Sequence, residues 1–258
     1  MTPALLVQSL YLVVLLGTLV VALRAVLERP VLARAFLAPG AIRLWSAMGA
    51  AWVFVLLAMA GSWIMREQHV GPVLSSVSIT GLMLLMLTAG CYPAAAALDT
   101  ENPAPLRSVS FFVLAIAVLL WSFTALELLR PLIDWKVKPG GFVDQVSIGR
   151  PFEFAAIAGF ALLAAVAEEI IFRGVLQPAL RSTGLPIVAA IFLTSLAWAV
   201  GHSGYIEPFG VKELQVLGLG LGLGYARWKF GLRGAIGLHL ANNASALLLE
   251  VLLRSTEY

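Results

Sequence analysis

The sequence predicts an all-α protein, a polytopic membrane helix bundle of about eight transmembrane helices, with about seven as the alternative count. Three observations support this fold class. Hydrophobic residues make up 60% of the chain and charged residues only 12%, against about 25% charged residues in an ordinary soluble domain. The mean hydropathy is +0.94. Apolar runs of about 20 residues, each long enough to cross a bilayer as a helix, recur along the chain.

The apolar runs follow one another in chain order, and each predicts one helix. Two of them, 186–202 and 213–229, are short for a membrane span, so these helices are expected to be tilted, partly re-entrant or longer than their apolar stretch. The predicted spans are 4–27, 44–65, 72–97, 109–134, 153–181, 186–202, 213–229 and 232–253.

We expect one integral membrane domain over residues 1–258. The longest polar interruption, 130–151, contains the turn residues of a loop and is too short to bury a core of its own. Ionisable residues that lie well inside apolar runs and could do chemistry all follow residue 150. The spans within 1–135 are therefore predicted to be a scaffold, and residues 150–253 are predicted to carry the function.

Charge and cysteine content exclude several classes of function. The net charge of +3 comes from basic residues scattered through the loops, and this pattern indicates no nucleic-acid patch. The single cysteine, Cys91, excludes an intramolecular disulfide and a multi-thiolate metal site. Glycines at positions 218, 220, 222 and 224 of the span 213–229 predict close helix packing, because small residues let neighbouring backbones approach in a membrane.

Three ionisable residues lie close together inside the apolar run 153–181: Glu168, Glu169 and Arg173. A charge near the centre of a membrane helix costs roughly 2.5–3.5 kcal/mol, so this group requires a reason. At about 100° per residue, Glu169 and Arg173 lie about 40° apart on one face, whereas Glu168 lies about 140° from Arg173. We therefore expect Glu169 to pair with Arg173 as a structural ion pair and Glu168 to be the reactive carboxylate.

Later spans carry further polar residues. His202 ends one span, one turn after Trp198, and His239 lies in the last span, one turn before Asn243. Each alone could be an interhelical hydrogen-bond partner. Because polar side chains in a membrane face a bundle interior or cavity, we expect them to converge with Glu168. A carboxylate, two imidazoles and a carboxamide can activate water and stabilise an oxyanion, which is the chemistry of hydrolysis.

The motifs Glu168-Glu-Ile-Ile-Phe-Arg173, Trp198-x-x-x-His202 and His239-x-x-x-Asn243 stand in this order in the chain. They resemble the motifs of the CAAX prenyl endopeptidase and bacteriocin-processing (CPBP) intramembrane proteases, also called the Abi family. The family usually has Phe where this chain has Trp198. The resemblance covers residues 150–253, which makes that segment the expected CPBP-like catalytic core.

This resemblance implies an intramembrane endopeptidase that hydrolyses a peptide bond of a membrane-associated or lipidated protein or peptide. Its expected partners are such a substrate and the lipid bilayer, without nucleic acid, and its expected location is the bacterial cytoplasmic membrane, as a multi-pass protein. Carried over by position, Glu168 and His202 activate water, His239 and Asn243 stabilise the oxyanion, and Glu169 and Arg173 support the site together with Trp198. Asn242 is expected to face away from the stripe of His239.

Zinc remains an alternative, because Glu168, His202 and His239 could hold Zn²⁺ with an open position for water. We expect no cofactor, because these residues lie on different helices and no His-Glu-x-x-His run is present. Two other classes of function stay open. A proton-coupled transporter would also bury such residues, but it predicts matching polar positions in both halves of the chain. A non-catalytic membrane scaffold would keep the fold without turnover.

Overall fold

The computed structural model describes Thr88, Cys91 and Ala95 and residues 104–134, 136–137, 151–202 and 206–254. These residues are almost entirely helical, so the predicted all-α class is confirmed. The one exception within them is an antiparallel pairing of two-residue strands, β1 (Lys136–Val137) with β2 (Ile206–Glu207). The predicted spans 4–27 and 44–65, and all of 72–97 except three residues, lie outside the described part.

Helix α5 (Val109–Leu129) is the predicted span 109–134 with an earlier end. Ser108 caps its N-terminus, where the hydroxyl oxygen accepts a hydrogen bond from the backbone N–H of Phe111. The helix ends at the residue before Arg130 because Pro131 follows, and a residue that precedes proline is disfavoured in a continuing helix. The short strand β1 comes shortly after this end.

The predicted span 153–181 is a continuous rod of three helical segments. These are α6 (Pro151–Glu168), the π-helix η1 (Glu169–Leu176) and α7 (Gln177–Ser182). The two glutamates therefore straddle the start of the wider π-helical turns. Such segments are rare and occur mostly at functional sites.

Pro178, near the start of α7, explains why the backbone carbonyl of Arg173 accepts a hydrogen bond from a side chain of α9. In η1 the backbone N–H of Gln177 donates to the carbonyl of Phe172, five residues back. The same pattern would bring the N–H of residue 178 to the carbonyl of Arg173, but proline has no N–H. The Arg173 carbonyl accepts instead from Nε of Arg227, at 3.1 Å.

Helix α8 (Ile187–Gly201) and the long helix α9 (Val211–Arg254) complete the described fold. The backbone of α9 breaks at Gly231, where φ is 74° and ψ is 178°, a conformation open essentially only to glycine. The break divides α9 into a first arm, 211–230, and a second arm, 232–254. These arms confirm the separate predictions of helices at 213–229 and 232–253.

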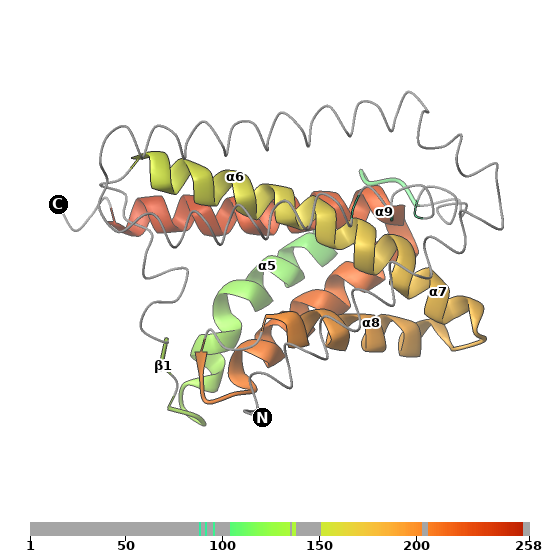
Figure 1. The fold of residues 1–258 in the computed structure, drawn as a ribbon, viewed down its shortest axis with the longest axis horizontal. Coiled ribbons are helices and arrows are strands. Elements are labelled where there is room, and N and C mark those ends of the chain that lie inside the picture. Colours follow the sequence, from blue (N-terminus) through green and yellow to red (C-terminus); the bar gives the residue numbers. More distant parts are fainter. Residues whose placement is uncertain are drawn as a thin grey trace.

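Helix α9 contacts α5, α6, η1 and α8 and so connects the described helices (Figure 1). Its first arm crosses α5 and α8, while its second arm runs alongside α6 (Figure 1). Because it touches every other long element, α9 brings polar residues of η1 and α8 against its own.

The alternating glycines of the first arm face two sides. A Cβ atom at Gly218 or Gly222 would collide with Trp121 or Val118 of α5. At Gly224 it would lie 2.7 Å from Cγ2 of Ile191 in α8. The predicted packing role of these glycines is therefore confirmed, with α5 on one side and α8 on the other.

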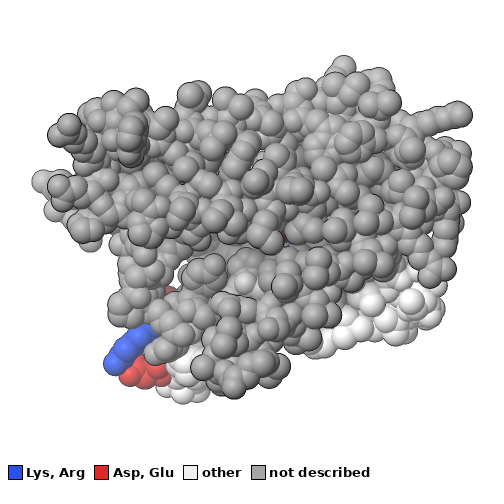
Figure 2. Space-filling model, in the orientation of Figure 1, with Lys and Arg blue, Asp and Glu red and all other residues white. Residues whose placement is uncertain are grey.

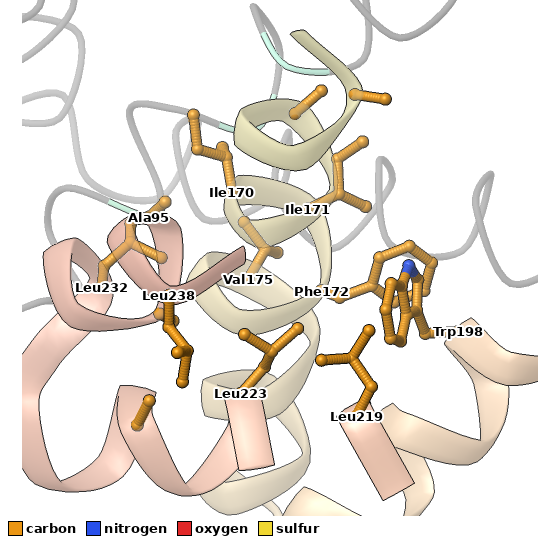
Figure 3. Packing of buried hydrophobic residues seen from close by; sticks show 14 of the residues in the cluster. Ala95, Ile170, Ile171, Phe172, Val175, Trp198, Leu219, Leu223, Leu232 and Leu238 are labelled. Carbon is orange, nitrogen blue, oxygen red and sulfur yellow. The ribbon is translucent and has the colours of Figure 1, made fainter. Parts of the chain in front are cut away.

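Aliphatic side chains surround η1 on the sides that face α9 and α8. Figure 3 shows Leu219 and Leu223 of α9 pointing toward η1, with Trp198 approaching from α8. Phe172 and Val175 of η1 are fully buried in this cluster. The buried ionisable residues of η1 thus lie in an apolar surrounding.

In length and composition, one helix of the described part, Val109–Leu129, could cross a membrane, and Ile187–Gly201 is apolar but shorter. Side chains of α5 such as Phe112, Val113 and Ile116 are more than half exposed. Figure 2 shows one face of the molecule, where the visible charged atoms of described residues gather at the corner beside β1 and the end of α5. Near the end of α5, Glu127 and Arg130 form an exposed ion pair.

The contact of α5 with α9 gives a first prediction. Gly218→Ala should lower stability by about 1–3 kcal/mol, because the new methyl group overlaps Trp121. Gly237→Ala, in the same helix, is the matched control, since no atom of the described residues lies within 4 Å of its Cβ position. Thermal unfolding of both variants in detergent measures the difference, and equal midpoints would contradict the packing.

Candidate active site

The predicted pair of Glu169 and Arg173 is confirmed. Nη1 of Arg173 lies 3.0 Å from Oε1 of Glu169, and both side chains are 0% exposed. Nη2 of Arg173 donates to the carbonyl of Gly220 in α9, at 3.3 Å. Its guanidinium lies 4.5 Å from the ring centroid of Trp198, within the range of a cation–π contact. The wider turns of η1 leave this pairing at four residues intact.

Glu169 has a second partner that the sequence did not predict. Nδ1 of His239 lies 2.9 Å from the same oxygen, Oε1. A carboxylate oxygen accepts, so the hydrogen of this bond is on Nδ1 of His239. His239 is 3% exposed. The second glutamate, rather than the first, therefore fixes the orientation of this imidazole.

Glu168 is half-buried and turned toward α8. Its Oε2 accepts a hydrogen bond of 2.8 Å from Nε1 of Trp198. This agrees with the expectation that Glu168 has no partner on its own helix. The other carboxylate oxygen, Oε1, is the one that this contact leaves for further hydrogen bonds.

His202 caps the C-terminus of α8. Its backbone N–H donates to the carbonyl of Ala199, and its ring atom Nδ1 lies 3.0 Å from the carbonyl oxygen of Trp198. Because a carbonyl oxygen only accepts, Nδ1 carries the hydrogen and Nε2 is the free ring nitrogen. Within the described part, Glu168 and His202 are connected through Trp198 and not by a direct hydrogen bond.

Asn243 joins the second arm of α9 to α6. Its amide Nδ2 donates to the carbonyl of Ala161 at 2.9 Å, and its Oδ1 accepts from Nδ2 of Asn242 at 3.2 Å. Asn242 is 8% exposed and the more buried of the two. The sequence assigned Asn242 no part, whereas the structure joins it to the site through Asn243.

Sequence reasoning also missed Gln177. This residue is 3% exposed, and its Nε2 donates to the carbonyl of Gly224 at 3.2 Å. Arg173 makes the equivalent bond to Gly220, four residues earlier on both helices. The signal was present in the four-residue spacing of Glu169, Arg173 and Gln177, which places a polar stripe on one face of the rod.

The residues proposed for a metal do not fit one in this geometry. Among the described residues, no three His, Cys, Asp or Glu side chains are grouped so that they could hold an ion together. Of the three predicted ligands, Glu168 and His202 bond to Trp198, whereas His239 bonds to Glu169.

The buried pair gives the second prediction. Arg173→Met should destabilise the protein by about 3–5 kcal/mol, because it removes the cation that pairs with the buried carboxylate of Glu169. The double variant Glu169→Gln/Arg173→Met removes both charges and should recover part of that loss. Chemical unfolding in detergent compares the three proteins. A double variant less stable than Arg173→Met would contradict the assignment of an ion pair.

Residues 150–245 match the family model described as Rce1-like, type II CAAX prenyl endopeptidase. No curated protein and no solved structure matches the chain. The three motifs that suggested this family from the sequence all lie inside the matched residues, as does the break at Gly231. The matched family is one of prenyl endopeptidases. Residues 150–245 are therefore similar to the Rce1-like family of type II CAAX prenyl endopeptidases.

Proposed function

We propose that this protein hydrolyses a peptide bond of a membrane-associated, lipidated protein or peptide, using a water molecule activated by Glu168. The observation that carries the proposal is the hydrogen bond that fixes one oxygen of Glu168 on Trp198. It orients a half-buried carboxylate and leaves Oε1 to accept a hydrogen bond from water. A positioned carboxylate of this kind can serve as a general base.

His202 supports the same step. With its Nδ1 hydrogen engaged by the Trp198 carbonyl, Nε2 is the ring atom that can accept a hydrogen bond. The oxygen of water attacks the carbonyl carbon of the substrate, and its proton passes to Glu168. When the C–N bond breaks, the same proton passes to the leaving amine. Glu168 thus ends the cycle as it began.

The oxyanion of the tetrahedral intermediate needs hydrogen-bond donors. We assign this role to Nε2–H of a protonated His239 and to the second amide hydrogen of Asn243. Protonated His239 and Arg173 together balance the negative charges of Glu168 and Glu169, which would otherwise be costly to bury. Glu169 supports this arrangement because it bonds both cations through one oxygen.

We propose a multi-pass arrangement in a bacterial cytoplasmic membrane, with about eight spans. The apolar composition and the exposed apolar face of α5 support this placement. A substrate with a lipid anchor would be held at the membrane together with the enzyme, which raises its effective concentration near the site.

Glu168→Gln should abolish cleavage while the protein stays folded, because the amide cannot accept a proton from water. A farnesylated, fluorescence-quenched peptide that ends in Cys-aliphatic-aliphatic-X reports cleavage by the protein purified in detergent. We expect a loss on the order of 10²–10⁴-fold. The matched control is Glu127→Gln on α5, whose carboxylate is exposed and pairs with exposed Arg130.

Cleavage by wild type, lost in Glu168→Gln and kept in Glu127→Gln, is the expected result. Full activity of Glu168→Gln would rule out Glu168 as the base. If the wild-type protein leaves the farnesylated peptide intact, a second peptide with a membrane-spanning anchor in place of the prenyl group tests the wider substrate class.

A chelator decides between direct activation of water and activation by a metal. Incubation with 1,10-phenanthroline, followed by its removal, should leave the cleavage rate unchanged, because the proposed mechanism involves no ion. A parallel sample of a zinc endopeptidase confirms that the treatment removes metal. Loss of cleavage that returns on addition of Zn²⁺ would contradict the metal-free mechanism.

A further inference from the structure

Trp198 contacts the site through three different groups. It lies in α8, is 1% exposed and is the largest fully buried side chain of the described part. Its indole N–H, its backbone carbonyl and its ring each touch a different set of polar residues. No other described residue contacts both Glu168 and His202 through a hydrogen bond.

The indole N–H is directed at the carboxylate proposed as the base. Its nitrogen, Nε1, lies 2.8 Å from Oε2 of Glu168. A hydrogen bond to a charged acceptor is stronger than one between neutral groups, and it selects one orientation of the carboxylate. Phenylalanine at this position would keep an aromatic ring but could donate no hydrogen bond.

The backbone carbonyl of Trp198 is available because α8 ends there. In a continuing α-helix the Trp198 carbonyl would accept from the backbone N–H of His202, four residues later. That N–H donates to the carbonyl of Ala199 instead. The ring of His202 supplies the donor instead, through Nδ1 at 3.0 Å. The end of the helix thus determines which nitrogen of His202 carries the hydrogen.

The indole ring of Trp198 contacts the side chains of His202, His239 and Arg173. Its centroid lies 4.8 Å from the ring of His202 and 5.3 Å from the ring of His239, both edge to face. The guanidinium of Arg173 lies over another part of it, at 4.5 Å. Such contacts restrict rotation of the indole, so its N–H stays directed at Glu168.

We propose that Trp198 is a positioning residue for hydrolysis, which holds the Glu168 carboxylate and the His202 imidazole in a fixed mutual orientation. This inference rests on the proposed function of Glu168 and His202. The indole N–H of Trp198 orients the carboxylate, its carbonyl sets the tautomer of the imidazole, and its ring contacts both His202 and His239.

The kinetic test compares two Trp→Phe variants that each lose one indole hydrogen bond. Trp198→Phe loses the bond to Glu168, and Trp121→Phe loses a 2.7 Å bond to the carbonyl of Gln215, between α5 and α9. On the farnesylated reporter, Trp198→Phe should lower kcat on the order of tenfold to a hundredfold, with KM within about twofold. Trp121→Phe should leave kcat within about twofold of wild type.

A purely structural role would not produce this difference. Both substitutions remove the same donor, so their thermal midpoints should fall by similar amounts, and only Trp198→Phe should lose turnover. Equal effects of the two variants on kcat would overturn the proposal, as would a loss in Trp198→Phe that appears in KM alone.

A second measurement is independent of activity and of the folding of Trp198→Phe. The chain has seven tryptophans, so their ¹⁵N-labelled indole N–H signals are few enough to assign by NMR. Substitution of Glu168 by Gln replaces a charged acceptor by a neutral one. The Trp198 indole proton should therefore move upfield in Glu168→Gln, whereas the Trp121 signal should stay in place.

An unchanged Trp198 signal in Glu168→Gln would overturn the proposed contact. The two hypotheses fail in different ways. If no reporter peptide is cleaved but the Trp198 signal shifts, the proposed function fails and the Trp198 arrangement stands. If cleavage depends on Glu168 but neither the signal nor kcat depends on Trp198, only the positioning role fails.

Discussion

One buried carboxylate oxygen, Oε1 of Glu169, determines how the helices around the site are joined. It accepts from Arg173 of its own helix and from His239 of the second arm of α9, with both partners buried. Arg173 in turn reaches the first arm at Gly220. Charges are costly in so apolar a surrounding, and each is offset by the other only while this geometry holds. The rest of the site is arranged around that pair.

The two adjacent glutamates have separate surroundings as a consequence. Glu169 lies in the apolar interior and bonds Arg173 and His239, whereas Glu168 is half-buried and accepts a hydrogen bond from the indole N–H of Trp198. They lie at the boundary where α6 becomes the π-helix η1. One carboxylate therefore stabilises the arrangement, and the other has an oxygen that is free for chemistry. This division is the basis of the proposed mechanism.

Helical spacing allowed several features to be predicted from the sequence. The four-residue separation identified the Glu169–Arg173 pair, and two apolar runs anticipated both arms of α9. Contacts between helices were less predictable, because angles along one helix do not define its neighbours. The bond from His239 to Glu169 is of this kind. The π-helix leaves no mark on hydrophobic periodicity, and strands of two residues are too short for an alternating pattern. Gln177 was missed although its spacing continued that of Arg173.

The break at Gly231 lets both arms of α9 contact the same segment of η1. The first arm of α9 is attached to Arg173 through Gly220, and the second is attached to Glu169 through His239. Both attachments end on a single turn of η1, so the two arms and that turn form a closed ring. The number of residues between Gly220 and His239 therefore sets the position of the His239 imidazole relative to Glu169. A residue inserted within it would rotate the imidazole away from its carboxylate, so insertions are tolerable only outside this ring.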